Sequence, residues 1–133
     1  MRVLLFGSDR PTSRTIVELL LKHGGVTELV TMKALGLTAY AKAEAESLGI
    51  PVRHFWMDPA HNRGAATRAA LMQMLAVAPP DLVMFVRPLA RHMPTAELCK
   101  ELGLQVVFGQ LNTSREVTWM TEWEPGEFAP ASR

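Results

Sequence analysis

Asp81-Leu-Val-Met-Phe-Val86, followed by Arg87-Pro-Leu-Ala-Arg-His-Met-Pro-Thr95, is the stretch that decides the fold. It is an apolar run that ends in a short polar loop, and the loop leads directly into a helical pattern. Met1-Arg-Val-Leu-Leu-Phe-Gly-Ser-Asp-Arg10 has the same order of features. If the two runs are neighbouring parallel strands, their loops meet at one edge of the sheet. Ligands of open α/β sheets bind at such a meeting point, so we expect the function there.

Apolar runs and helical patterns alternate through most of the 133 residues. The expected strands are 2–6, 28–32, 52–56, 81–86 and 104–108. Short, nearly all-apolar runs are typical of strands that are buried on both faces. Their alternation with helices predicts βαβ units and a three-layer α/β domain, with a parallel sheet of about five strands and helices on both faces. The expected strand order is 3-2-1-4-5.

Helix ends and faces follow from capping residues and spacing. Thr12 or Ser13 is the expected N-cap of the first helix, and Gly24-Gly25 ends it. The second helix is expected after Thr38. The later helices carry small or apolar residues at three- and four-residue spacing: Ala65, Ala69, Met72 and Ala76 in the third, and Thr95, Leu98, Cys99 and Leu102 in the fourth.

The end of the chain has a different pattern. Val117, Trp119, Thr121 and Trp123 alternate with Glu116, Thr118, Met120 and Glu122, a period of two that is typical of a half-buried strand. This strand either extends the sheet antiparallel at an edge or pairs with another subunit, and its tryptophans either pack on that edge or stack on a base. We therefore divide the chain into a domain at 1–112 and a C-terminal extension at 113–133, with a loose end beyond Glu124.

Composition excludes several classes of protein. Hydrophobic residues make up 48% and charged residues 20%, as in ordinary globular domains, and the net charge of +1 does not suggest a general nucleic-acid binder. Cys99 is the single cysteine, so an internal disulfide is excluded. No apolar stretch is long enough for a signal peptide or a membrane span. We expect a cytoplasmic protein with no membrane partner.

Residues after the first strand are candidates for binding an anion. Gly7, Ser8, Asp9 and Arg10 precede a helix N-terminus, where backbone N–H groups favour negative charge. Alternatively, Gly7 only permits the turn and Asp9 caps the helix. The G-x-G-x-x-G and G-x-x-x-x-G-K-[ST] fingerprints are absent, which argues against NAD enzymes and P-loop hydrolases.

Cationic residues lie at several expected strand ends and helix starts. Arg87 and Arg91 follow the fourth strand beside His92, and Lys33 and Arg68 hold similar positions. Guanidinium groups there could grip a phosphate or carboxylate, and four converging cations would be a specific signal. The alternative is a solvated loop with outward-pointing arginines.

Catalytic and metal-binding patterns are not found in the sequence. The four histidines lack metal-ligand spacing with Cys99 or with paired carboxylates. Cys99 falls on an apolar helix face, which favours packing over nucleophilic catalysis. Ser8 has no Gly-x-Ser-x-Gly elbow and no identifiable base partner. We expect no metal, no cofactor and no catalytic residue.

The segment from Met1 to Phe108 resembles the SLOG superfamily, in its YspA-like branch, by order and spacing more than by identity. Met1–Ser8 resembles the family's first strand and glycine-rich turn, and Gly49-Ile-Pro-Val52 the run before strand three. Ala34-Leu-Gly-Leu-Thr38 resembles part of a G-G-A-x-G-A-D loop, with Gly36 keeping its glycine and Thr38 in the aspartate position. Arg63–Arg68 resembles the A-G-x-x-R-N-x-x-M segment, with Ala69 in place of asparagine.

The loop after strand four departs from that family. The G-G-x-G-T loop of the family reads Arg91-His-Met-Pro-Thr95 here, so that only the threonine is kept, and Leu98 stands where the hydrolase members have glutamate. The resemblance implies a Rossmann-like fold and a nucleotide or nucleotide-derived ligand; relatives include the LOG phosphoribohydrolases and the DNA-processing protein DprA. Phosphoribohydrolase activity is not expected.

The leading hypothesis is a non-catalytic domain that binds a nucleotide or nucleotide derivative. Its expected ligand-binding residues are Gly7, Ser8, Asp9, Arg10, Lys33, Gly36, Arg68, Arg87, Arg91 and Thr95. The alternative is a decayed SLOG domain that acts as an interaction or structural module, oligomerising through residues 113–123. An enzyme acting on a nucleotide is a third possibility, without an identifiable acid, base or nucleophile.

Overall fold

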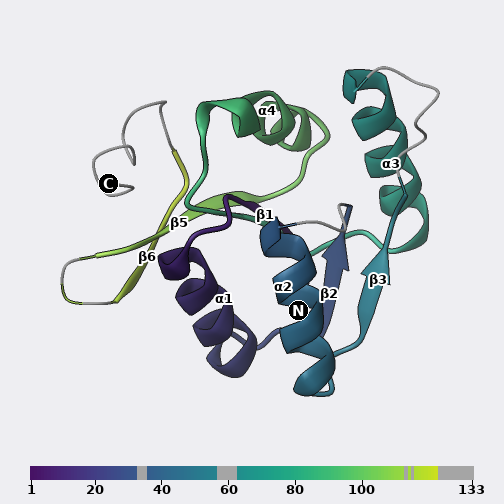
Figure 1. Cartoon of the computed structure of the whole chain (residues 1–133). Coiled ribbons are helices and arrows are strands. Elements are labelled where there is room, and N and C mark those ends of the chain that lie inside the picture. Colours follow the sequence, from purple (N-terminus) through teal and green to yellow (C-terminus); the bar gives the residue numbers. More distant parts are fainter. Residues whose placement is uncertain (33–35, 57–62, 113, 115, 123–133) are drawn as a thin grey trace.

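The computed structural model describes residues 1–32, 36–56, 63–112, 114 and 116–122 (Figure 1). Its sheet has six strands in the order β3-β2-β1-β4-β5-β6. The strands are β1 (Arg2–Gly7), β2 (Glu28–Thr31), β3 (Val52–His54), β4 (Leu82–Val86), β5 (Val106–Leu111) and β6 (Val117–Met120). The helices are α1 (Pro11–His23), α2 (Gly36–Ser47), α3 (Arg63–Val77), a 3₁₀ helix η1 (Ala90–His92) and α4 (Met93–Glu101). The predicted fold class and strand order are confirmed.

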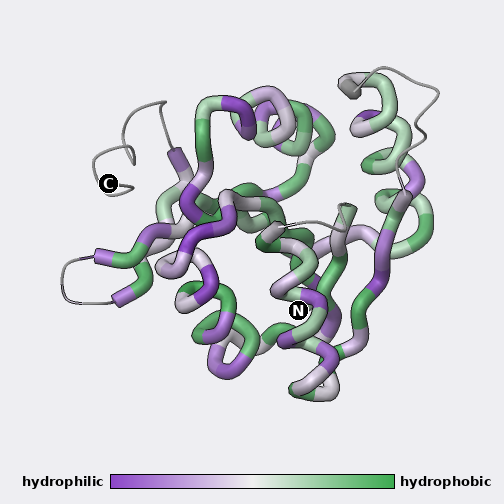
Figure 2. Tube along the Cα trace, in the orientation of Figure 1, coloured by the Kyte–Doolittle hydropathy of each residue, from purple (hydrophilic) through white to green (hydrophobic). Residues whose placement is uncertain are grey.

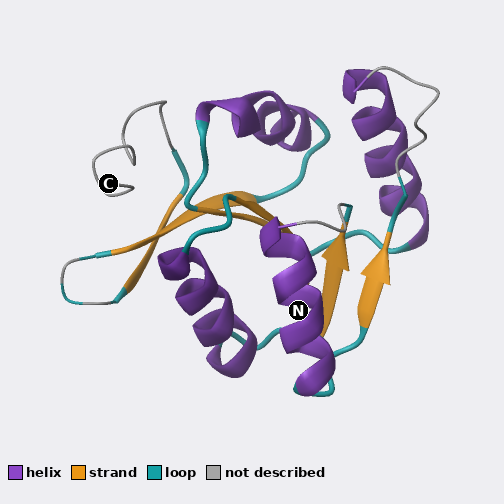
Figure 3. Ribbon diagram, viewed as in Figure 1, coloured by secondary structure: helices purple, strands orange, loops and turns teal. Residues whose placement is uncertain are grey.

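Helices cover both faces of the sheet, as Figures 1 and 3 show. Side chains alternate between the two faces of a strand, so β1 divides its apolar residues between two cores. Val3 and Leu5 pack with α1 and α2, whereas Leu4 and Phe6 pack with α3 and α4. In Figure 2, hydrophilic and hydrophobic residues alternate along α1, whose apolar side faces the sheet. In the described ranges no helix combines the length and apolarity that a membrane crossing requires.

The first helix begins earlier than the sequence predicted. Arg10 occupies the N-cap position and Pro11 the first helical position, so Thr12 and Ser13 lie inside the helix and the predicted cap is wrong. Proline is favoured at the first helical position because its ring fixes φ and its missing N–H would have no intrahelical partner there. The preference of proline for that position therefore prevails over the capping preference of the hydroxyl residues.

The buried face of α3 also differs from the predicted one. The helix packs through Ala66, Ala70, Leu71 and Met74, whereas the stripe at Ala65, Ala69, Met72 and Ala76 is exposed. Alanine and apolar residues occur on both sides of this helix, so spacing alone fits two faces. The face that contains Leu71 and Met74 is buried with the core.

The C-terminal strand extends the sheet of its own chain. β6 pairs antiparallel with β5, with Gly109 opposite Trp119, and β5 extends to Leu111 to provide this pairing. The ring of Trp119 lies where a side chain at residue 109 would be. Of the two uses expected for Trp119, packing on the edge strand is therefore observed. Trp123 lies outside the described residues.

Replacing Gly109 with alanine should destabilise the fold by about 1–3 kcal/mol, because the new methyl group overlaps the Trp119 ring. Urea unfolding measures the loss. In a Trp119→Ala background the same substitution should cost much less, since the ring is gone. An equal cost in both backgrounds would contradict this packing.

Candidate functional site

The carboxyl ends of β1 and β4 are joined directly. Gly7 is the register partner of Val86, and the Ser8 amide donates a hydrogen bond to the Val86 carbonyl at 3.2 Å. The Ser8 hydroxyl donates to the Arg87 carbonyl at 2.6 Å. Both loops that were expected to meet at the sheet edge are thus held against each other. Ser8, which makes both of these hydrogen bonds, is buried.

Arg87 is a buried link between elements. Its φ of +47° lies in the left-handed region, where it is the one non-glycine residue among those described. Its amide donates to the Gly109 carbonyl at 2.9 Å, and its guanidinium donates to Thr12 Oγ1. Burial, and secondarily the charge of Arg10, lowers the pKa of Arg87. The side chain ties β4 to α1.

A cavity of about 270 Å³ lies at this end of the sheet. Its walls come from the end of β1, the start of α2 and η1, and consist of Phe6, Gly7, Asp9, Gly36, Leu37, Thr38, Arg91 and His92. The sheet order reverses between β1 and β4, so the cavity occupies the topological switch point where open α/β sheets bind ligands.

Close packing explains the glycine at position 7. A Cβ there would lie 2.5 Å from the Val86 carbonyl oxygen and 2.6 Å from Leu37 Cδ2. The absence of a side chain therefore lets the start of α2 approach the sheet. Gly36, at the first position of α2, has a φ of +60°, which glycine adopts at little cost. These two glycines bring the start of α2 to the cavity.

The negative charge of Asp9 is compensated locally. Its two carboxylate oxygens accept hydrogen bonds of 2.9 and 3.0 Å from Arg14, and these bonds hold the pKa of Asp9 below its usual value. The Arg14 guanidinium also lies 4.6 Å from the Tyr40 ring centroid. Asp9 is thus held in an ion pair, and the residue at the N-cap is Arg10, without a side-chain cap bond.

Arg91 supplies the positive charge of the cavity. Among the residues that the structure describes, it forms no ion pair. Since Arg14 neutralises Asp9, the cavity has an excess positive charge. This electrostatic balance favours an anionic ligand.

His92 also lines the cavity. From the sequence it was noted only as the neighbour of Arg91 and was not predicted as a site residue. Its Nδ1 accepts a hydrogen bond from the Leu89 amide at 2.9 Å, and its ring packs edge-on against Phe85 with 6.1 Å between centroids. With Nδ1 as the acceptor, the neutral imidazole carries its proton on Nε2. Thr38 is a further wall residue that was not predicted from the sequence, although the family resemblance placed it at the aspartate position of the G-G-A-x-G-A-D loop.

The predicted site residues separate into two groups. Gly7, Asp9, Gly36 and Arg91 line the cavity. Ser8, Arg10, Arg68, Arg87 and Thr95 do not line it, and Lys33 lies outside the described residues. Arg68 is on α3, where its Nη2 lies 3.4 Å from Glu101 Oε2 of α4. Of the described members of the predicted cation cluster, only Arg91 reaches the cavity.

Neither a cluster of metal-ligating side chains nor an exposed thiol lies in the described part of the chain. Within the described ranges, no three residues of the histidine, cysteine, aspartate and glutamate types gather where they could hold a metal. Cys99, on α4, is buried in the core with residues of α3 and the sheet. Burial raises the pKa of its thiol to about 12. Its role is packing, as the sequence predicted.

Comparisons with known proteins support the fold alone. No protein-family model matches the chain, and no curated protein matches it in sequence. Protein VC1899 from Vibrio cholerae is similar in structure, with a TM-score of 0.57 and 16% identity over 90% of this chain and 33% of that one. The chain therefore spans about a third of the length of VC1899.

Two further structures match less well. The C-terminal domain of PF1911 hydrogenase from Pyrococcus furiosus gives a TM-score of 0.45 and 15% identity, over 80% of this chain and 89% of that one. A formyltetrahydrofolate deformylase from Pseudomonas putida KT2440 gives 0.44 and 19%, over 82% and 37%. The assignment of a function therefore depends on the site itself.

Ser8→Ala should destabilise the protein by about 1–3 kcal/mol, because it removes a buried donor and leaves the Arg87 carbonyl without that bond. Chemical denaturation measures the change. Ser47→Ala is the matched control, since its hydroxyl makes a similar 2.9 Å bond to the Glu44 carbonyl at an exposed position. Equal effects of the two substitutions would contradict a bridging role for Ser8.

Cys99 should be inert in the native protein. The thiolate is the reactive form, and a pKa near 12 lowers its population at pH 8 far below that of an exposed cysteine. We expect Ellman's reagent to react about 1,000-fold more slowly with the folded chain than with the chain in urea. Comparable rates would show that the helix α4 packing is wrong.

Proposed function

We propose that this domain binds a nucleotide or nucleotide derivative, without catalysis, in the cavity between β1, α2 and η1. The observation that carries the proposal is the charge balance of that cavity. Arg91 has no ion pair with the described residues, whereas the Asp9 carboxylate is held by Arg14. An anionic group such as a phosphate fits this arrangement.

The start of α2 supplies further donors. Gly36 and Leu37 line the cavity and hold the first two positions of the helix. The first N–H groups of a helix lack intrahelical acceptors and carry partial positive charge, so they favour an anion. Arg91 belongs to η1, which follows β4, whereas α2 follows β2, and β1 lies between these two strands. The guanidinium and the helix start would contact one phosphate from two directions.

Binding is favoured over catalysis by the state of the titratable side chains in the wall. The Asp9 carboxylate accepts two hydrogen bonds from Arg14, and Nδ1 of His92 accepts one from a backbone amide. The Asp9 carboxylate and Nδ1 of His92 are therefore not positioned to take a proton from a ligand. Membership of the SLOG superfamily belongs to the same proposal, with Arg91 taking over the role of the glycine-rich phosphate loop.

An interaction module is the second candidate. β6 is the last strand in the sheet order, so one of its edges pairs with no other described strand. Edge strands of this kind can pair with another chain. In this case residues 113–123 would join subunits, and the ligand cavity would have no function.

A thermal-shift screen against nucleotides, dinucleotides, cyclic nucleotides, nucleotide sugars and phosphate tests the proposal. A ligand at 100 times its Kd should add about 2.7 kcal/mol of stability. Arg91→Ala should weaken the selected ligand about 2- to 5-fold, as expected for the loss of an exposed charge pair worth less than about 1 kcal/mol. Arg68→Ala is the control, since Arg68 pairs with Glu101 outside the cavity.

Two results would refute ligand binding at this cavity. The first is a folded protein that no member of the panel stabilises, which would favour the interaction module. The second is a ligand whose affinity is the same in the Arg91→Ala variant as in the native chain.

A further inference from the structure

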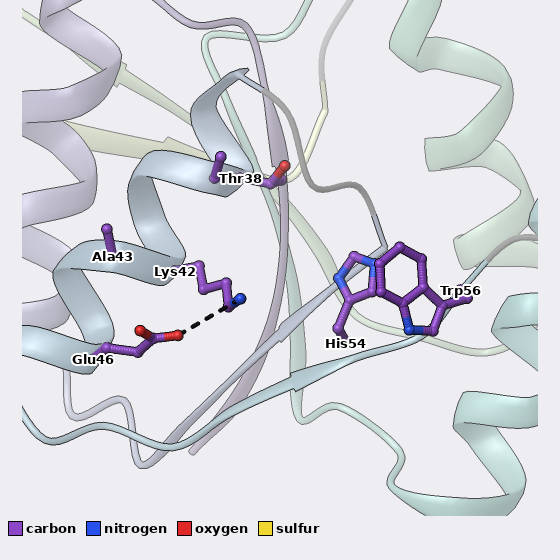
Figure 4. Close-up of a pocket in the computed structure, with 7 residues that line it drawn as sticks. Thr38, Lys42, Ala43, Glu46, His54 and Trp56 are labelled. Atoms are coloured by element: carbon purple, nitrogen blue, oxygen red, sulfur yellow. Dashed lines mark ion pairs between the residues drawn. The ribbon is translucent and has the colours of Figure 1, made fainter.

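A second cavity, of about 330 Å³, lies between α2 and the edge strand β3 (Figure 4). Its walls are Thr38, Ala39, Lys42, Ala43 and Glu46 from α2, and His54 and Trp56 from β3 and the residues directly after it. Thr38 lines both cavities. The two spaces are therefore neighbours along one side of α2.

Trp56 is exposed and yet oriented. It is 76% exposed, the highest value among the large apolar side chains in the described ranges. Its ring contacts that of His54 edge-on, with 4.3 Å between centroids and 68° between planes. His54 is fixed in turn by a 2.7 Å hydrogen bond between its Nδ1 and Thr31 Oγ1. The indole thus forms a positioned aromatic surface beside the cavity.

The opposite wall provides polar groups. Lys42 extends from α2 toward His54, and Glu46 lies one turn further along the helix (Figure 4). Their ion pair is long, at 3.8 Å, and both side chains are more than half exposed. Such a pair is weak in water, so the ammonium and carboxylate can turn to a ligand.

His54 adds no charge to this wall at pH 7. Burial, and secondarily the charge of Lys42, lowers the pKa of its imidazole below the ordinary 6.5. The cavity therefore combines an aromatic surface with the ammonium of Lys42 as a donor and the carboxylate of Glu46 as an acceptor of hydrogen bonds. This is the chemistry by which proteins recognise a nucleobase: stacking on its face and hydrogen bonding to its edge.

The size of the two cavities suits one extended ligand. The first is slightly smaller than the roughly 300–1,000 Å³ of typical ligand sites, and the two together fall within that range. Their lining residues on α2 run from Gly36 to Glu46, about 15 Å along the axis at 1.5 Å per residue. A ring and a phosphate joined by a sugar would follow this side of the helix.

We propose that the cavity between α2 and β3 holds the heteroaromatic ring of the nucleotide, stacked on Trp56, with the edge of the ring on Lys42 and Glu46. This inference rests on the proposed function for the phosphate half. It identifies the ligand as one with a nucleobase, so ribose 5-phosphate should bind far more weakly than a nucleotide.

Calorimetric titration of the full chain with AMP, GMP, CMP and UMP, and with ribose 5-phosphate, tests the inference. Trp56→Ala should weaken the best nucleotide about 5- to 150-fold, as loss of a stacked base predicts. The same variant should bind ribose 5-phosphate as the native chain does, and Trp56→Phe should keep most of the affinity. Met72→Ala, at an exposed apolar residue on α3, is the matched control and should change nothing.

The outcomes separate the two proposals. Nucleotide binding that Arg91→Ala weakens and Trp56→Ala leaves unchanged overturns the ring site and keeps the proposed function. Binding that Trp56→Ala weakens and Arg91→Ala leaves unchanged supports the ring site and overturns the phosphate position. A folded native chain that binds none of the four nucleotides overturns the ring site, and one that also binds no member of the wider panel overturns both proposals. Circular dichroism of each variant verifies folding, which the exposure of Trp56 should preserve.

Discussion

The parallel pairing of β1 with β4 is the constraint on which the rest of the structure depends. Its register runs from Val3 opposite Leu82 to Gly7 opposite Val86. The hydrogen bond from the Ser8 hydroxyl to the Arg87 carbonyl, between residues 79 positions apart in sequence, extends the pairing into the two loops. A slip by one residue would exchange the two faces of β1, which are both buried. The register therefore determines both cores and the meeting of the loops.

The same pairing explains how α2 reaches the candidate site. Because residue 7 has no side chain, Leu37 packs against the end of the strand pair. The start of α2 then forms one wall of the cavity, and Thr38 stands between it and the space beside β3. A glycine that resembles a phosphate-binding turn in sequence thus acts here through packing, and the positive charge of the cavity wall comes from Arg91.

The fold could be predicted from the sequence because the patterns that determine its strands and helices are local. Strands buried on both faces are continuous apolar runs, and the helices between them end at glycine or proline. The α3 face was predicted wrongly because both sides of that helix carry small residues, and only contact with the sheet separates Leu71 from Met72. The α1 cap was predicted wrongly because Pro11 begins the helix before the hydroxyl residues.

The site could be predicted from the sequence only in part, because loop residues have no periodicity that indicates the direction of their side chains. Arg87 and Arg91 are close in sequence, yet one is buried against Thr12 and the other lines the cavity. The pairing of Asp9 with Arg14 likewise depends on the path of the chain into α1. Trp56 had no sequence pattern that distinguished it from the other residues of the predicted strand 52–56, whereas the observed β3 ends at His54.

The two cavities would contribute to binding in different ways. Arg91 is exposed, so water and salt screen its attraction for a phosphate, and an exposed charge pair is typically worth less than about 1 kcal/mol. A phosphate alone would then bind weakly. Stacking on Trp56 would bury apolar surface, and the free energy gained by this burial depends little on screening by salt. A cavity whose described wall contains one exposed cation would therefore need the ring for affinity, whereas the cation and the helix start would orient the ligand along α2.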